Sequence, residues 1–137
     1  MNNYNIFLKL LNDNKIYEQI ALEKVIKLNN VSLLKTCDNY KYDFKTSDNL
    51  KYEVKADHKC NITGNFFIEF NGYNKPSGIS TTKANYYILT DTTIYYLIDV
   101  SILKHICKNK RIAKTPDNSA VGFLISKFLI INNSIVI

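Results

Sequence analysis

Apolar positions in the first quarter of the chain follow a helical period and then switch to alternation. A helix is predicted over residues 14–28, where apolar residues recur three and four positions apart, and a shorter one over residues 4–11. Asp13 or Asn14 is suited to cap the longer helix. Beyond it the period changes, so residues 31–35 are predicted to form a first strand.

Two alternating runs, residues 41–46 and 50–56, flank the polar sequence Ser-Asp-Asn, which is typical of a β-hairpin. A three-residue turn would pair Asp43 with Glu53. Paired residues share a face, as do residues two apart, so Asp43, Glu53 and Lys55 are predicted to lie on one side. A slip of one residue would separate the carboxylates. The other side, expected to pack on a core, carries Tyr42, Phe44, Tyr52 and Val54.

The rest of the chain has no repeat, no low-complexity linker and no break in composition, so residues 1–137 are expected to form a single domain. Its pattern predicts an α/β fold with a mixed central sheet flanked by helices. Strand or helix stays open for residues 122–126 and 130–137. The other predicted elements are a strand at 65–70, a loop at 71–80, a short helix at 81–85, a strand pair at 86–90 and 93–98, a helix capped by Asp99 or Ser101 that ends near Lys108, and a basic loop at 109–118.

Composition narrows the class of protein. The net charge of +6 and the pI near 9.1 favour a polyanionic partner such as nucleic acid. No uninterrupted apolar stretch is long enough to span a membrane, and the first residues lack the pattern of a secretory signal. The three cysteines are far apart and odd in number, which suits a reducing compartment. We expect no membrane association and an intracellular location, in cytoplasm or nucleus, in a protein that a virus or phage could encode.

The acidic hairpin is the main candidate for chemistry. Two facing carboxylates repel each other, and a divalent cation would convert that repulsion into binding. Carboxylates, a backbone carbonyl and water are the ligands that Mg²⁺ prefers. Lys55 could orient a metal-activated water and stabilise charge on a phosphate. The alternative is an exposed hairpin with scattered surface charges.

Asp43, nine intervening residues and then Glu53-Val54-Lys55 resemble the PD-(D/E)xK nuclease superfamily, with the restriction-endonuclease-like fold. The likeness extends over residues 14–70 and departs at Tyr42, where the family name has proline. It implies an αβββαβ core and phosphodiester cleavage that depends on Mg²⁺, with Mn²⁺ able to substitute. By the same resemblance, Asp43, Glu53 and the Val54 carbonyl ligate metal and Lys55 serves the water nucleophile.

The sequence leaves open which further acidic residue, if any, ligates the metal. Several branches of the superfamily, including archaeal-type Holliday junction resolvases, add a glutamate from the first helix. Glu18 is the candidate for that ligand, with Glu23 as its substitute, and either could instead be a solvated helix carboxylate. Glu69, on the strand after the motif, is either another acidic ligand or an edge charge.

Two segments are candidates for DNA contact. In the segment from residue 75 to 83, hydroxyl groups and free N–H groups could grip a phosphate, or the segment is an ordinary capped loop. It resembles a stretch in small phage and virus nucleases of the superfamily. A basic cluster follows residue 100, and a solvated helix end is the alternative there. The candidate DNA-binding residues are Ser77, Ser80, Thr81, Thr82, Lys83, Lys104, Lys108, Lys110 and Arg111, with His105 and Lys114 also in the cluster.

The leading expectation is a Mg²⁺-dependent DNA endonuclease. A domain this small suits recognition of DNA structure over sequence, and a Holliday-junction-resolvase-like homodimer cutting branched DNA is the sharper form. The alternatives are a restriction or repair-type endonuclease on duplex DNA, a catalytically inactive nucleic-acid-binding protein of the same fold, and a structural or interaction protein.

The spacing of Asp57, His58 and Cys60 fits no common zinc site.

Overall fold

The structure is a computed structural model that describes residues 3–5, 15–37 and 41–137. Most of the helix predicted at residues 4–11, and the caps Asp13 and Asn14, lie outside the described residues. The helices and strands in chain order are α2 (Lys15–Asn29), β1 (Leu33–Thr36), β2 (Phe44–Thr46), β3 (Lys51–Ala56), α3 (Cys60–Thr63), β4 (Asn65–Gly72), β5 (Lys75–Pro76), the 3-10 helix η1 (Gly78–Ser80), β6 (Tyr86–Thr90), β7 (Tyr95–Asp99), α4 (Val100–Cys107), β8 (Ile112–Lys114), β9 (Ala120–Ser126), α5 (Lys127–Asn132) and β10 (Ile135–Val136).

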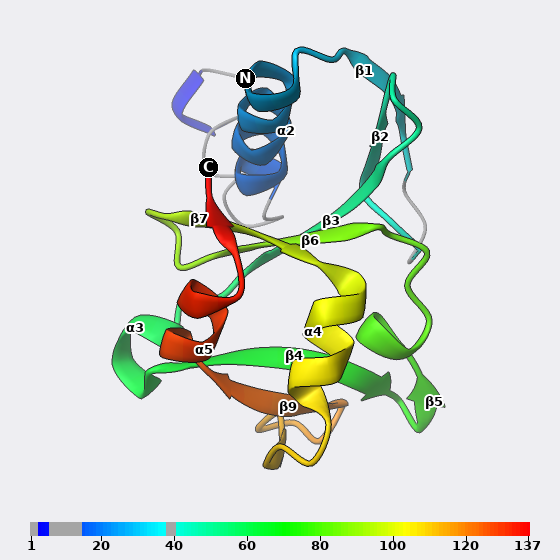
Figure 1. Cartoon of the computed structure of the whole chain (residues 1–137). Helices are drawn as coiled ribbons and strands as arrows, with labels where there is room; N and C mark the ends of the chain where they lie inside the picture. The colour runs from blue at the N-terminus through cyan, green and yellow to red at the C-terminus, as the bar shows by residue number, and fades with distance from the viewer. Residues whose placement is uncertain (1–2, 6–14, 38–40) are drawn as a thin grey trace.

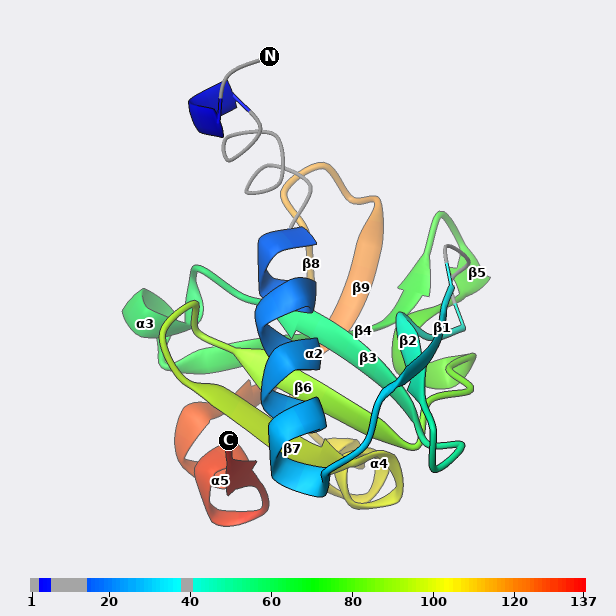
Figure 2. The ribbon, with the colours of Figure 1, turned by 90° about the horizontal axis from the view of Figure 1, so that it is seen from above.

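These elements form four layers (Figure 1). A six-stranded sheet of order β1-β2-β3-β6-β7-β10 lies in the middle, and α2 crosses over one of its faces (Figure 2). The helices α4 and α5 lie on its other face, and a four-stranded sheet of order β5-β4-β9-β8 lies beyond them. Strands β3 and β6 are parallel whereas their neighbours pair antiparallel, so the predicted mixed sheet flanked by helices is confirmed.

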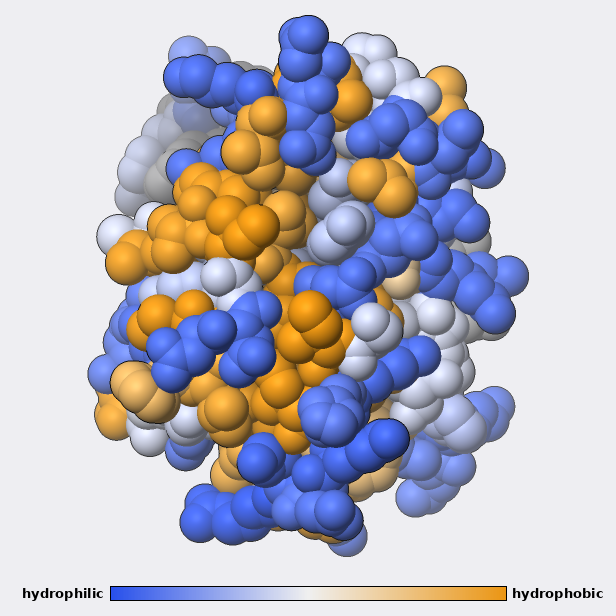
Figure 3. All heavy atoms as spheres, in the orientation of Figure 1, coloured by the Kyte–Doolittle hydropathy of each residue, from blue (hydrophilic) through white to orange (hydrophobic). Residues whose placement is uncertain are grey.

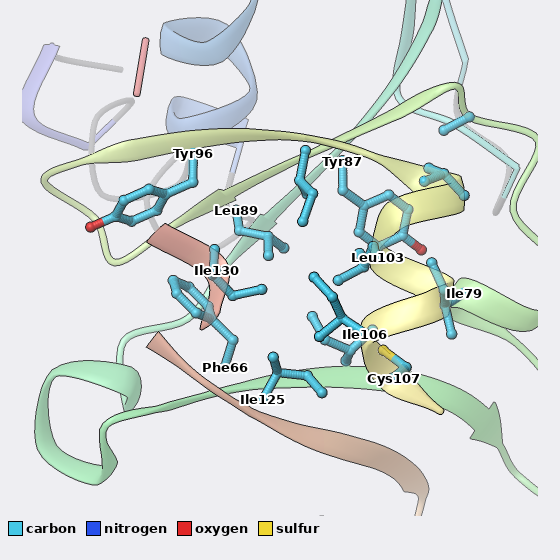
Figure 4. Close-up of a cluster of buried hydrophobic side chains, with 14 of the residues drawn as sticks. Phe66, Ile79, Tyr87, Leu89, Tyr96, Leu103, Ile106, Cys107, Ile125 and Ile130 are labelled. Carbon is cyan, nitrogen blue, oxygen red and sulfur yellow. The ribbon is translucent and has the colours of Figure 1, made fainter. Parts of the chain in front are cut away.

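Two hydrophobic cores hold the layers together. The first joins α2 to the six-stranded sheet through residues such as Val25, Tyr52 and Ile88. The second fills the space between the two sheets. Figure 4 shows Tyr87 and Leu89 extending from β6 into that space, toward Phe66 and Ile125 of the four-stranded sheet. The six-stranded sheet is therefore covered on both faces, which is why Tyr87, Ile88 and Leu89 are all buried along a single strand.

The hairpin β2–β3 has the predicted register, with Phe44 opposite Tyr52 and Lys45 opposite Lys51. Its three-residue turn places Asn49 in the left-handed region, at φ 67°, which asparagine tolerates. The prediction that Tyr42 shares the face of Phe44 is wrong, because Tyr42 packs in the core between the sheets. The pairing with β3 begins only at Phe44, so strict alternation does not extend back to Tyr42.

The route from β3 to β6 differs from the prediction. The strand predicted at residues 65–70 exists as β4, but it belongs to the second sheet. Residues 81–85, all of them described, form no helix, and a single 3-10 turn, η1, precedes them. Asn85 explains this difference, because its N–H donates to the carbonyl of Lys51 and its side chain accepts from the Lys51 N–H. These bonds hold the end of the segment alongside β3.

The C-terminal region resolves the assignment left open by the sequence. Asp99 caps α4 as predicted, and the basic loop contains the short strand β8. Residues 120–126 form β9, Ser126 caps α5, and β10 pairs with β7. Phe128 and Ile135 in this region are exposed apolar residues. Figure 3 shows apolar side chains gathered on the surface of this face of the molecule. No helix in the described ranges is long and apolar enough to cross a membrane.

Candidate active site

Strand β3 sets the geometry of the candidate site. Glu53 and Lys55 are two residues apart on one face of the strand, and the Lys55 ammonium lies 3.2 Å from Glu53 Oε1. Glu53 is 8% exposed, whereas the side chain of Lys55 is half-exposed. β3 lies between β2 and β6 in the sheet, so the strand that carries this buried carboxylate has a neighbouring strand on each side.

Asp43 reaches the same strand from just outside β2. Its Oδ2 accepts a hydrogen bond of 2.7 Å from the Val54 N–H, and its own N–H donates to the carbonyl of Tyr52. Asp57 donates its N–H to Thr90 of β6, so alternation along β3 turns the backbone groups of Val54 toward the β2 side. The Asp43 carboxylate and the Val54 carbonyl therefore lie on the same side of β3, as a shared metal site requires.

Glu18 is the helix carboxylate that joins this group. It lies on α2, close enough to Asp43 for the two charges to act on each other. Burial and then the negative charge of Asp43 raise the pKa of Glu18. Glu23 is exposed and accepts a hydrogen bond from Gln19, so it does not take this place.

The electrostatics of Glu53 are the most perturbed among these carboxyl groups. Burial raises its pKa from the ordinary value of 4.5 to about 7, and the negative charges of Asp43 and Glu18 add to this effect against the opposing charge of Lys55. Its Oε2 is buried and has no hydrogen-bond partner among the described residues. A buried carboxylate oxygen without a partner is costly unless a proton or a cation compensates it.

The neighbouring groups respond to the same crowding. Burial raises the pKa of Asp43, although the Val54 N–H and the positive charge of Lys55 oppose the rise. Burial alone would favour the neutral amine of Lys55, but the attraction of Glu53 outweighs it and raises the pKa of Lys55. Lys55 is therefore a cation at neutral pH, and it partly neutralises a cluster of three carboxyl groups.

Glu69 and Tyr87 border the cluster on the side of the second sheet. Glu69 accepts a hydrogen bond of 2.8 Å from the Ser77 hydroxyl, and its charge also acts on Lys55. Gly78 lies so close to Glu69 that a Cβ there would come within 2.2 Å of the Glu69 carbonyl, and its φ of +53° also favours glycine. Burial raises the pKa of Tyr87, and the charge of Glu53 adds to the effect. The motif alone did not single out Tyr87, because a tyrosine pair on a strand is typical of a core.

The hydroxyl-rich segment, residues 75–83, makes hydrogen bonds to other parts of the protein. The Ser77 and Ser80 hydroxyls donate to Glu69 and to the carbonyl of Phe70, and Thr82 donates to the carbonyl of Lys41. Each hydroxyl has one hydrogen to donate, so these donors are already engaged. The Thr81 hydroxyl is buried, with no partner among the described residues. Lys83 is exposed, and its N–H binds the Lys41 carbonyl. The segment therefore ties the acidic hairpin to β4.

The basic cluster divides between two places. Lys104 and Lys108 line a hollow of about 220 Å³ together with Ser80. Lys114 instead lines a larger cavity that begins at Lys55. The side chains of Lys110 and Arg111 are exposed. The sequence cluster is therefore not a single patch.

Asp57 has a structural role. Its Oδ1 accepts hydrogen bonds from the N–H groups of Lys59 and Cys60, and its Oδ2 accepts one from Phe67. Both oxygens are used to turn the chain from β3 into α3 and to hold β4. These hydrogen bonds explain why an acidic residue precedes His58, and no bound metal is needed to explain it.

The donor set of the cluster consists of carboxylates and a backbone carbonyl, the oxygen ligands that Mg²⁺ prefers. In residues 3–5, 15–37 and 41–137, no three His, Cys, Asp or Glu side chains converge closely enough to hold an ion as they stand. Asp43 is turned to Val54, and Glu53 is turned to Lys55. Mg²⁺ usually takes only one or two carboxylates and keeps several waters. The partnerless Oε2 of Glu53, with the charge of Asp43 acting on the same carboxyl group, fits that demand.

Neither a scan against models of known protein families nor a search of curated proteins finds a match to this chain.

Proposed function

We propose that this chain is a Mg²⁺-dependent endonuclease that hydrolyses phosphodiester bonds in DNA, on a core of the restriction-endonuclease-like type. The observation that carries the proposal is the buried, partnerless Oε2 of Glu53, which lies among other carboxyl groups with Lys55 beside it. Strongly perturbed carboxyl groups held beside a cation are frequent at active sites. The helix, the three antiparallel strands β1–β3 and the parallel strand β6 add support, although the connection to β6 lacks a long helix.

Each residue has a distinct role in this proposal. Asp43, Glu53 and the Val54 carbonyl hold the ion, and Glu18, whose pKa the charge of Asp43 raises, positions Asp43. Bound there, Mg²⁺ or Mn²⁺ supplies an acidified water and neutralises charge on the phosphate. Lys55 orients the attacking water and stabilises the charge that develops on the phosphate oxygens. Its half-exposed ammonium is able to reach a ligand outside the protein surface.

The proposed substrate is DNA with a branched or unpaired structure, cut by a homodimer. The net charge of +6 favours a polyanion. The basic side chains divide between two hollows, one at Lys104 and Lys108 and one at Lys114. Such a division suits DNA arms that diverge from the site better than a single straight duplex.

A cleavage assay tests the proposal. The purified chain is incubated with a four-way junction, a flap and a linear duplex, each with Mg²⁺ and with EDTA. We expect Mg²⁺-dependent cutting of the branched forms, abolished in Asp43→Asn and retained in Glu23→Gln, which makes the same kind of change at an exposed site. Equal cutting of linear duplex would exclude selectivity for structure. No cutting, with salt-sensitive binding retained, would favour a non-catalytic binding protein.

A further inference from the structure

A cavity of about 480 Å³ opens beside the candidate active site. It lies between the central strands β3 and β6 of the first sheet and the second sheet, and its lining includes Lys55, Glu69 and Tyr87. Lys55, whose ammonium is paired with Glu53, lines the cavity, so the cavity adjoins the carboxylate cluster. Its volume falls in the range of cavities that bind small organic groups, roughly 300–1,000 Å³.

The walls of the cavity are apolar and partly aromatic. Phe67, Tyr87, Leu89 and Leu124 contribute to them. The ring of Phe67 lies over Gly122, where a Cβ would come within 2.6 Å of the ring. Glycine at this position allows the ring to lie against β9. A planar aromatic wall of this kind suits stacking with a flat, apolar group.

The charged lining residues supply cations around these apolar walls. Lys59 and Lys114 line the cavity with exposed side chains, and His58 lies beside them. The acidic residues of the lining are Asp57 and Glu69, and both accept hydrogen bonds from the protein. A ligand that matches this distribution has a flat apolar part and an anionic part.

We propose that the cavity receives the unpaired base of the nucleotide next to the cleaved phosphate. This inference rests on the proposed function, because it assumes that the phosphate backbone lies at Lys55. A base within a duplex is stacked on both sides and cannot enter a side cavity without being extruded, whereas an unpaired base enters at little cost. The cavity would thus select flaps, gaps and branched DNA over intact duplex, with Lys59 and Lys114 holding the flanking phosphates.

The binding experiment varies both the protein and the DNA, in EDTA so that no cleavage occurs. Affinity for a duplex with a short single-stranded flap is measured by fluorescence anisotropy, with the flap either intact or carrying abasic sites. The variant Ala113→Phe fills the cavity from β8. Ile112→Phe is the matched control, because Ile112 precedes Ala113 on the same strand, is exposed and does not line the cavity.

We expect the wild type to bind the abasic flap roughly tenfold more weakly than the intact one, the effect of losing one stacked base. Ala113→Phe should lose about the same factor with the intact flap and nothing further with the abasic one, while Ile112→Phe behaves as the wild type. Equal wild-type affinity for the two flaps would overturn the proposal, whether or not Ala113→Phe folds. Equal losses in both variants would also overturn it.

The outcome is separable from that of the proposed function. If the wild type cuts no DNA in Mg²⁺ but discriminates between the flaps in EDTA, the nuclease proposal fails while the base-binding cavity stands. If it cuts DNA but binds both flaps equally, the reverse holds.

Discussion

Two buried carboxylates in this protein, Asp91 and Glu53, have nearly the same exposure and opposite surroundings. Asp91 is 4% exposed and Glu53 is 8% exposed. Asp91 accepts hydrogen bonds from the N–H groups of Thr93 and Ile94, and its second oxygen lies 2.6 Å from the Lys127 ammonium. Glu53 has Lys55 at one oxygen, and its other oxygen has no partner among the residues that the structure describes.

The difference appears in the pKa of each group. Burial opposes ionisation of Asp91, but the Ile94 N–H and the Lys127 ion pair outweigh it and lower its pKa. Burial raises the pKa of Glu53 to about 7, and the nearby Asp43 adds to that rise. Burial of a carboxylate is therefore not in itself a sign of function. A fully compensated charge stabilises the fold, whereas a carboxylate with a partnerless oxygen among other acids supports the proposal of a cation site.

The largest expected effect comes from making the partnerless carboxylate neutral. Glu53→Gln should reduce Mg²⁺-dependent DNA cleavage by about a thousandfold, equivalent to about 4 kcal/mol of transition-state stabilisation, because it removes a charged metal ligand with little change of shape. Single-turnover rates at saturating enzyme measure this. Asp91→Asn, assayed well below its melting temperature, should cut at the wild-type rate. Equal losses in the two variants would remove the distinction between the carboxylates.

The free energy of unfolding should be lowered by the substitution of Asp91 and raised by that of Glu53. Asp91→Asn leaves the Lys127 ammonium, which is a quarter exposed, without its ion-pair partner, and it should lower the free energy of unfolding by about 3 kcal/mol. In EDTA at pH 8, Glu53→Gln should instead raise that free energy, because it removes a buried charge repelled by Asp43. Urea unfolding followed by circular dichroism compares the two. Destabilisation by Glu53→Gln would show that its charge is compensated in the folded protein.

The pH dependence of stability separates the same two groups. The folded-state pKa of Glu53, about 7, is above its ordinary value of 4.5, so the folded state binds the proton more tightly. Metal-free protein should therefore lose stability as pH rises from 4.5 to 7, by no more than about 3 kcal/mol from this group. Asp91 has a lowered pKa, so its contribution is present above pH 3.8 and is lost as pH falls below it. Urea midpoints from pH 3 to 8 in EDTA should show the first slope in the wild type and a smaller one in Glu53→Gln.

The acidic hairpin shows which structural features the sequence predicts and which it does not. Alternation around a three-residue turn predicts the pairing of Phe44 with Tyr52 correctly, because one slip would expose a whole apolar face. Alternation does not predict the position of Tyr42, because the pairing between β2 and β3 ends at Phe44. Beyond that point the Val54 N–H binds the Asp43 side chain instead of a backbone carbonyl. The proximity of Asp43 to β3 follows from the sequence, whereas the bond that fixes it does not.

The second sheet could not be predicted from the pattern of β4. Alternation identifies a strand but does not say which sheet it joins, and β4 pairs with β9, in which the partner of Gly72 is Ala120, 48 residues later. The cavity beside Lys55 lies between the two sheets, so it could not be predicted from the sequence either. The helix expected at residues 81–85 fails for a local reason, because Asn85 binds the backbone of Lys51. Contacts between distant segments decide these features.

The smallest expected effect concerns the choice between two glutamates on one helix. The charge of Asp43 acts on Glu18, whereas Glu23 is exposed and binds Gln19. Glu18→Gln keeps the shape of the side chain but removes an ionisable group beside Asp43, so Mg²⁺ affinity should fall about tenfold, the usual result of altering a residue that orients a ligand. Glu23→Gln should leave the affinity unchanged. Isothermal titration with Mg²⁺ measures both, and a Glu18→Gln affinity equal to that of Glu23→Gln would mean that Asp43 is positioned by Val54 alone.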